Sequence, residues 1–81
     1  MGKSIGRIYR LAKQIAEDEA AEVLRELREV DGVEEADITD ERTMLKVKTA
    51  DELYPAVMSK AVNICRRVAR GTDLSFVRFD Y

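Results

Sequence analysis

The stretch that most constrains this chain is residues 20–38, AAEVLRELREVDGVEEADI. Apolar side chains recur there at steps of three and four, which places them on one face of a helix: Ala20, Val23, Leu24, Leu27 and Val30. We expect Asp31-Gly32 to end this helix in a left-handed cap, because Gly adopts a positive φ without a Cβ penalty. A strand should follow, with apolar residues Val33, Ala36 and Ile38. The rest of the chain must cover the apolar surface of this helix–turn–strand unit.

The second half of the chain predicts a strand, a helix and a final strand. Residues 43–49, TMLKVKT, alternate apolar and polar side chains after a turn at residues 39–42, which indicates an antiparallel hairpin with the preceding strand. A helix is expected over residues 51–69 and should end at Gly71, before a last strand at residues 74–81. The buried stripe of this helix is expected to be Val57, Ala61, Ile64, Cys65 and Val68.

Residues 3–19 admit two interpretations. In the first, residues 6–12 form a strand, and the helix begins at Asp18, a suitable N-cap. In the second, Ser4 caps a single helix that runs to Glu29, because isoleucines also recur there at helical spacing. The second interpretation removes one strand and leaves a three-stranded sheet.

The strand interpretation gives the order strand-helix-strand-strand-helix-strand for a single domain over residues 1–81. Right-handed crossovers then interleave the two halves into an α+β, ferredoxin-like βαββαβ sandwich, with a four-stranded antiparallel sheet and two helices on one face. Tyr9 and Leu11 should face inward from the first strand. The other expected core residues are Val23, Leu24, Leu27, Val30, Ile38, Leu45, Val47, Val57, Ala61, Ile64, Val68 and Val77.

Charge and cysteine content exclude several classes of protein. The net charge is −2, which gives no general attraction for nucleic acid or anionic membrane. Basic residues flank an acidic middle, residues 15–42, which suggests charges that pair across a compact fold. With one cysteine, no histidine and no apolar run of about 20 residues, we expect a cytoplasmic domain that does not itself insert into a membrane.

Several segments together resemble the heavy-metal-associated (HMA) domain of copper chaperones and metal-pumping P-type ATPases. The segments are YRL at residues 9–11, LREVDGVEEADI at residues 27–38, MLKVKT at residues 44–49, and a second helix that runs to Arg70-Gly71. YRL looks especially like the first strand of cadmium- and zinc-type pumps. The resemblance spans residues 8–79 and implies a ferredoxin-like fold and a place in or beside a cation transporter.

The chain departs from that family at its metal site. The family binds soft metals through a CxxC motif between the first strand and first helix, and the two cysteine positions fall on Ala16 and Glu19. Thiolates make such a site select copper(I), zinc or cadmium, so we expect neither tight metal binding nor any cofactor. Glu17 and Asp18 are weak candidates for a hard cation. They are more simply explained as acids that the start of a helix favours.

The remaining chemistry is sparse. Cys65 could be a reactive thiol, but its place on an apolar stripe predicts a small core residue. Arg66, Arg67 and Arg70 could bind phosphate, although basic residues are common where a helix ends. The chain contains no histidine and no Ser or Cys beside a plausible base, so we expect no enzymatic activity.

The sequence therefore favours a degenerate HMA-like domain, a non-catalytic regulatory or docking module of a cation-transporting P-type ATPase. Its expected partner is another protein or the remainder of the transporter, not nucleic acid, and a homodimer through a sheet edge is possible. Two alternatives stay open at this point. One is a metal carrier that uses the acidic loop, and the other is a stand-alone ferredoxin-like interaction domain.

Overall fold

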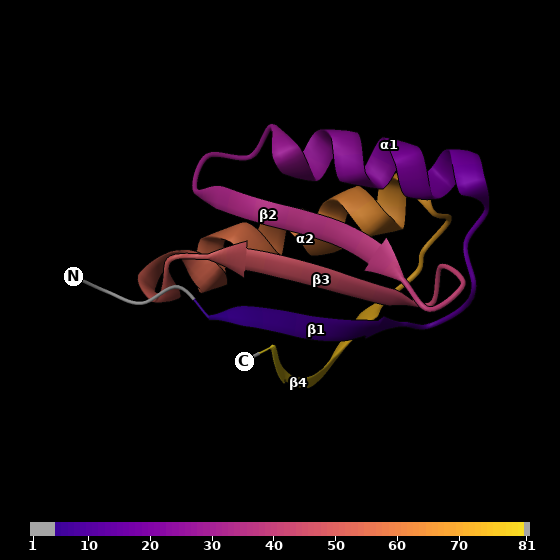
Figure 1. The fold of residues 1–81 in the computed structure, drawn as a ribbon. Coiled ribbons are helices and arrows are strands. Elements are labelled where there is room, and N and C mark those ends of the chain that lie inside the picture. The colour runs from indigo at the N-terminus through magenta and orange to yellow at the C-terminus, as the bar shows by residue number, and fades with distance from the viewer. Residues whose placement is uncertain (1–4, 81) are drawn as a thin grey trace.

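The computed structural model describes residues 5–80 of the chain. All strand pairs are antiparallel in one four-stranded sheet of order β2-β3-β1-β4, and both helices pack on the same face of it (Figure 1). This arrangement confirms the predicted ferredoxin-like fold. The elements are β1 Gly6–Leu11, α1 Glu17–Arg28, β2 Val33–Thr39, β3 Met44–Thr49, the 3₁₀ turn η1 Asp51–Leu53, α2 Tyr54–Val68 and β4 Leu74–Asp80.

The observed first strand decides between the two interpretations of residues 3–19. β1 lies between β3 and β4 and pairs with both, so the single long helix is wrong; Ser4, its expected cap, lies outside the described residues, as does Tyr81. Tyr9 and Leu11 are buried against the helices, whereas Arg10 is exposed on the outer face. The alternation required of a half-buried strand therefore outweighs the helical spacing of the isoleucines.

The N-cap of helix α1 lies two residues before the expected one. Ala16, not Asp18, is the N-cap residue, and its backbone N–H donates to Oε1 of Glu19 at 2.8 Å. That hydrogen bond is one half of a capping box. Asp18 instead lies in the first turn between Glu17 and Glu19, where the helix dipole favours carboxylates.

The end of α1 is also displaced from the prediction. The helix ends at Arg28 with Glu29 as its C-cap in a right-handed conformation. Gly32 does have the predicted positive φ, +94°, but it lies in a turn closed by a 3.2 Å hydrogen bond from the Val33 N–H to the Val30 oxygen. The residue needs the left-handed region for the turn into β2 and not for a helical cap.

The end of α2 follows a Schellman pattern with an unexpected residue. The N–H of Gly71 donates to the Arg66 oxygen at 2.8 Å, which matches the long-range bond of that motif. The residue between the Ala69 C-cap and Gly71 is Arg70, and its φ is +53°. Gly71 was expected to end the helix; Arg70 occupies the left-handed position before it.

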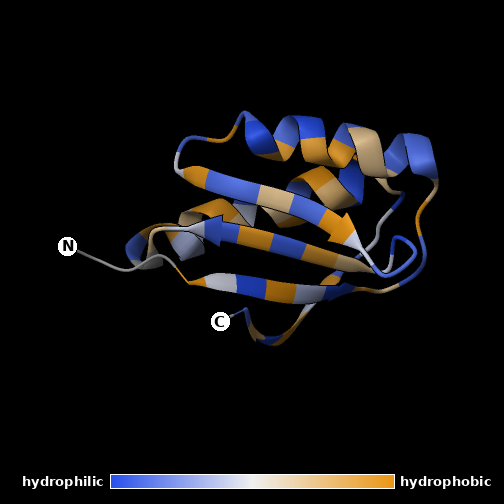
Figure 2. Ribbon diagram, viewed as in Figure 1, coloured by the Kyte–Doolittle hydropathy of each residue, from blue (hydrophilic) through white to orange (hydrophobic). Residues whose placement is uncertain are grey.

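The core lies between the sheet and the two helices, and the apolar side of α1 faces the sheet (Figure 2). Seven predicted core residues are buried and four more are partly buried against them: Val23, Leu27, Leu45, Val47, Val57, Ala61 and Ile64, then Leu24, Val30, Ile38 and Val68. Val77 was wrongly expected inside, since it is 38% exposed at an irregularity in β4. Ile15, buried in the loop after β1, is a core residue that the sequence did not reveal.

No helix among residues 5–80 combines the length and the apolar character that a membrane crossing requires.

Candidate functional site

Three connecting segments meet at one end of the sheet, which we call the loop end: residues 12–16 after β1, residues 40–43 between β2 and β3, and residues 69–73 after α2 (Figure 1). Backbone hydrogen bonds join them. The N–H of Ala12 donates to the Asp73 oxygen at 2.9 Å, and the N–H of Ile15 donates to the Arg42 oxygen at 3.3 Å. The loop end is the region where the HMA-like metal site was expected.

The turn between β2 and β3 is left-handed over three successive residues. Asp40, Glu41 and Arg42 have φ of +52°, +56° and +66°. Each such residue costs about 1–2 kcal/mol relative to a right-handed conformation, because its Cβ approaches the following carbonyl. Within the turn, Thr43 donates from its N–H to the Thr39 oxygen at 3.2 Å and from its hydroxyl to the Asp40 oxygen at 2.6 Å.

The loop after β1 holds this turn in place through side chains. Nε2 of Gln14 donates to the Glu41 oxygen at 2.7 Å, and Nε of Arg42 donates to the Ile15 oxygen at 2.9 Å. The Ile15 N–H returns a bond to Arg42, so the two segments are joined in both directions. The apolar side chain of Ile15 is buried and anchors the loop to the core. The unfavourable backbone of the turn is thus fixed by contacts distant in sequence.

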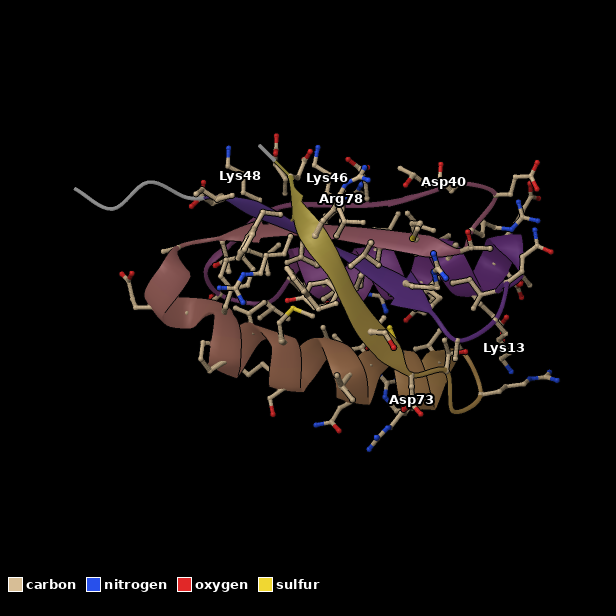
Figure 3. All side chains as sticks on the ribbon, turned by 90° about the horizontal axis from the view of Figure 1, so that it is seen from below. Lys13, Asp40, Lys46, Lys48, Asp73 and Arg78 are labelled. Atoms are coloured by element: carbon tan, nitrogen blue, oxygen red, sulfur yellow. The ribbon has the colours of Figure 1, made fainter. Side chains whose placement is uncertain are left out.

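Backbone strain is concentrated at the loop end. Within residues 5–80, the non-glycine residues with positive φ are Asp40, Glu41, Arg42 and Arg70, and all four lie there. Arg70 also contacts the loop after β1, because its oxygen accepts a 3.4 Å hydrogen bond from Nζ of Lys13. Figure 3 shows Lys13 beside the C-terminal end of α2. Sequence reasoning missed Gln14 and Arg42 in these roles. Asp40 is a residue type that tolerates the left-handed region, but nothing local in residues 39–43 marks three such residues in succession.

The acidic residues of the loop end do not converge on a common point. Oε1 of Glu19 accepts from the Ala16 N–H, and its Oε2 lies 3.9 Å from Nε of Arg70. Glu17 is highly exposed and lies 4.0 Å from Nη1 of Arg42, while Asp18 is exposed. In the part of the chain that the structure describes, no group of three or more His, Cys, Asp or Glu side chains is placed to hold a metal ion. The prediction that soft metals do not bind tightly remains to be tested.

A shallow surface pocket of about 410 Å³ occupies the same region. Its lining includes both positions that align with the family's cysteines, Ala16 and Glu19, together with Lys13, Gln14, Asp18, Val68 and Arg70. Its charged lining residues are of both signs, and the Glu19 carboxylate already contacts Ala16 and Arg70. The pocket therefore has the mixed polar character of a protein contact surface more than that of a cation cage.

The two other candidates from the sequence do not form sites. Cys65 is fully buried on α2, as predicted, and burial raises the pKa of its thiol to about 11. The three arginines near the end of α2 point to different acids: Arg66 to Asp73 at 3.2 Å, Arg67 to Glu26, and Arg70 to Glu19. This separation removes the convergent cations that a phosphate site needs.

Fold and site together define a small α+β domain of the ferredoxin-like class, with a loop end where two turns are hydrogen-bonded to the segment between β1 and α1. Comparison of the chain with protein-family models gives no matching family, and comparison with curated proteins gives no match.

Proposed function

We propose that this domain is a non-catalytic docking or regulatory module of a cation-transporting P-type ATPase, descended from an HMA-like domain that lost its two thiols. Its loop end is the contact surface. The observation that carries the proposal is the concentration of backbone strain at that end, on four residues that are not glycine. Strained backbone persists where surrounding contacts enforce it, and it clusters at functional sites.

A surface whose backbone is already held by hydrogen bonds suits docking. Asp40 and Glu41 are exposed at the tip of the left-handed turn, and their backbone is held by Gln14 and Thr43. A partner that binds this tip loses little conformational entropy from it, because the tip is already ordered. Glycine at the same positions would relieve the strain. It would also give the backbone more conformational freedom, both in the unfolded chain and in the exposed turn of the folded one.

The geometry of α1 supports the HMA-like part of the proposal. Ala16 is the N-cap and Glu19 is three positions later in the first turn, and both line the same pocket. Residues at this spacing lie on one side of a helix, so two thiols there could reach one soft ion. Restoring the thiols therefore tests descent from the family directly.

A competition titration with a zinc chelator makes this test. The unmodified chain should bind zinc, cadmium and copper(I) only weakly, whereas Ala16→Cys with Glu19→Cys should bind one equivalent tightly. The matched control is Ala16→Cys with Asp18→Cys, which adds the same number of thiols at a spacing that splays them. Tight binding by the unmodified chain would favour a carrier instead. Equal binding by both double variants would contradict the alignment of the metal loop.

Docking is tested separately by site-specific photocrosslinking in the native cells. A photoreactive residue at Glu41 on the loop end should capture a cation-transporting ATPase, which mass spectrometry would identify. The control position is Ser59, which is also exposed but lies on α2, away from the loop end. Capture of the same protein from both positions, or capture of no transporter from Glu41, would contradict the proposal.

A further inference from the structure

The two helices carry opposite charges. Helix α1 contains five acidic residues and two arginines, whereas α2 contains one lysine, two arginines and no acidic residue. Their formal net charges are therefore −3 and +3. The helices lie side by side on one face of the sheet and run in opposite directions (Figure 1). The helical layer, which is the surface formed by α1 and α2, thus has an acidic side and a basic side.

Ion pairs join the two sides of the helical layer over only part of its length. Arg67 contacts Glu26, and Nε of Arg70, two residues after α2, lies 3.9 Å from Oε2 of Glu19. Between residues 17–28 and residues 54–66, all of which the structure describes, there is no ion pair. The acidic and basic sides are therefore not joined along the part of α2 that precedes Arg67.

A groove of about 440 Å³ separates the helices at that level. Its apolar lining residues, Val30 and Ile64, belong to the core or pack against it. The polar lining residues are acidic on the α1 side and mostly basic on the α2 side: Glu26, Glu29 and Asp31, then Lys60, Asn63 and Arg67. Asp31 and Lys60 are exposed, and within residues 5–80 neither forms an ion pair. Each wall of the groove thus carries an uncompensated charge, and the two charges are of opposite sign.

This arrangement of charges restricts what the groove can accept. A uniformly basic segment would be repelled by Lys60, and a uniformly acidic segment would be repelled by Asp31. A surface that itself has an acidic and a basic side meets opposite charges on both walls. The helical layer of this chain is such a surface, because a rotation of 180° about an axis along the groove sets the acidic side of one copy against the basic side of the other.

We propose that a second copy of this chain occupies the groove, in a two-fold dimer whose helical layers face each other. Helix α2 of each copy lies over the groove of the other copy and covers Val30 and Ile64. Because the axis runs along the groove, residues that line the same part of it remain level with one another. Asp31 of each copy therefore contacts Lys60 of the other, and the dimer contains this contact twice.

The polar character of the contact sets its strength. Ion pairs between exposed side chains each contribute little, and the apolar part of the groove is limited to two residues. The dimer therefore belongs among the weak protein contacts, which bury less than about 1,200 Å². The groove shares no residue with the loop end, so the docking proposed for that end does not compete with the dimer.

Sedimentation equilibrium of the unmodified chain between about 10 µM and about 1 mM tests the dimer. At about 0.05 M salt the dissociation constant should fall inside this interval. Raising the salt to about 0.5 M should increase the constant about tenfold or more, because salt screens charges near the surface. A chain that stays monomeric throughout the interval at low salt, or association that salt does not weaken, would overturn the proposal.

A charge reversal in the groove locates the contact. Lys60→Glu should increase the dissociation constant about tenfold or more, since it turns both contacts with Asp31 into repulsions. The matched control is Arg78→Glu, which changes the charge equally at an exposed position on the outer face of the sheet (Figure 3). It should leave association unchanged. An equal effect of the two variants would mean that net charge alone controls association, and it would overturn the proposal.

A mixture of two variants tests whether the occupant is a second copy. Chains with Asp31→Lys and chains with Lys60→Glu should each associate poorly, because both contacts in either dimer join like charges. In a mixed dimer, one contact keeps Asp31 and Lys60, and the other joins the two substituted residues, which have opposite charges. The mixture should therefore associate about tenfold or more tightly than either variant alone.

The two variants should keep the fold, because both substituted positions are exposed, and circular dichroism checks this. A mixture of folded variants that associates no more tightly than its two components would overturn the second copy as the occupant of the groove.

Discussion

Turns at both ends of the sheet require residues with a positive φ, but different residue types occupy those positions. At the end opposite the loop end, the turn into β2 needs a positive φ, and Gly32 supplies it. At the loop end, Gly71 also has a positive φ, but Asp40, Glu41, Arg42 and Arg70 adopt one as well, although glycine would do so with less strain. The first end is therefore shaped for stability. The loop end keeps an unfavourable backbone conformation, and contacts from neighbouring segments hold that conformation in place.

The largest effect is expected at the glycine end. Gly32→Val should destabilise the fold by about 2 kcal/mol or more, because a β-branched residue resists positive φ and its Cβ would lie 2.7 Å from Leu53 Cδ1. The comparison is Gly71→Val at the loop end: its φ is +80° and no atom lies within 4 Å of the added Cβ, so it should cost only about 1 kcal/mol. Urea denaturation of both variants gives the comparison. Equal losses would mean that Leu53 moves aside without consequence.

The non-glycine residues with positive φ at the loop end should respond in the opposite direction. Glu41→Gly is expected to stabilise the fold by about 1 kcal/mol, since it removes the left-handed penalty and keeps the backbone oxygen that Gln14 binds. Glu41→Ala is the matched control, because alanine keeps the penalty, and it should leave the urea midpoint nearly unchanged. If Glu41→Gly lowered the urea midpoint, the left-handed turn would not be strained, and the contrast between the two ends would not hold.

A smaller gain is expected at the end of α2. Arg70→Gly places the preferred residue in the left-handed position of the Schellman motif, but it also removes the contact with Glu19. The two changes partly offset each other, and a net gain of about 0.5 kcal/mol should appear in thermal melting. Arg70→Ala loses the same contact and keeps the penalty, so it should melt below the unmodified chain. Identical melting of the two variants would contradict a strained Arg70.

The smallest effect is expected between the two ends, on the exposed side of α1. A hydrogen bond from Arg25 lowers the pKa of Glu22 from its usual 4.5 to about 2. A carboxyl whose pKa falls on folding stabilises the native state above its unfolded value, and that contribution is lost as the pH drops from 4.5 toward 2. Solvent screening keeps it small. An NMR titration should show the pKa of Glu22 returning toward 4.5 in Arg25→Gln; an unchanged value would remove Arg25 as the cause.

The same contrast explains which parts of the structure follow from sequence. Local periodicity and the Asp31-Gly32 pair predicted α1, the turn and β2, because those signals act within a few residues. The left-handed turn at residues 40–42 has no glycine or asparagine, and it depends on Gln14 and Ile15, more than twenty residues earlier. The features that the sequence did not predict depend on contacts between residues far apart in the chain.

The candidate site and the core show the same limit. Counting back from Gly32 placed Ala16 and Glu19 at the start of α1, where they do lie. It could not reveal that Ala16 caps the helix or that the Glu19 carboxylate contacts Arg70. Val77 was misplaced because a bulge is a property of the pair of strands, and β4 alone gives no sign of it.

The buried thiol of Cys65 can report how often the fold opens. Thiol reagents attack the thiolate, and with a pKa of about 11 only about one molecule in ten thousand would be ionised at neutral pH even if the reagent could reach it. Labelling must therefore wait until the core between α2 and the sheet opens, and its rate reports how often that happens. Thiols introduced at exposed positions of the loop end, such as Ala16, are reached by the reagent without any opening of the fold. A brief exposure to reagent would then count those thiols alone, and a long one would time the opening of the fold.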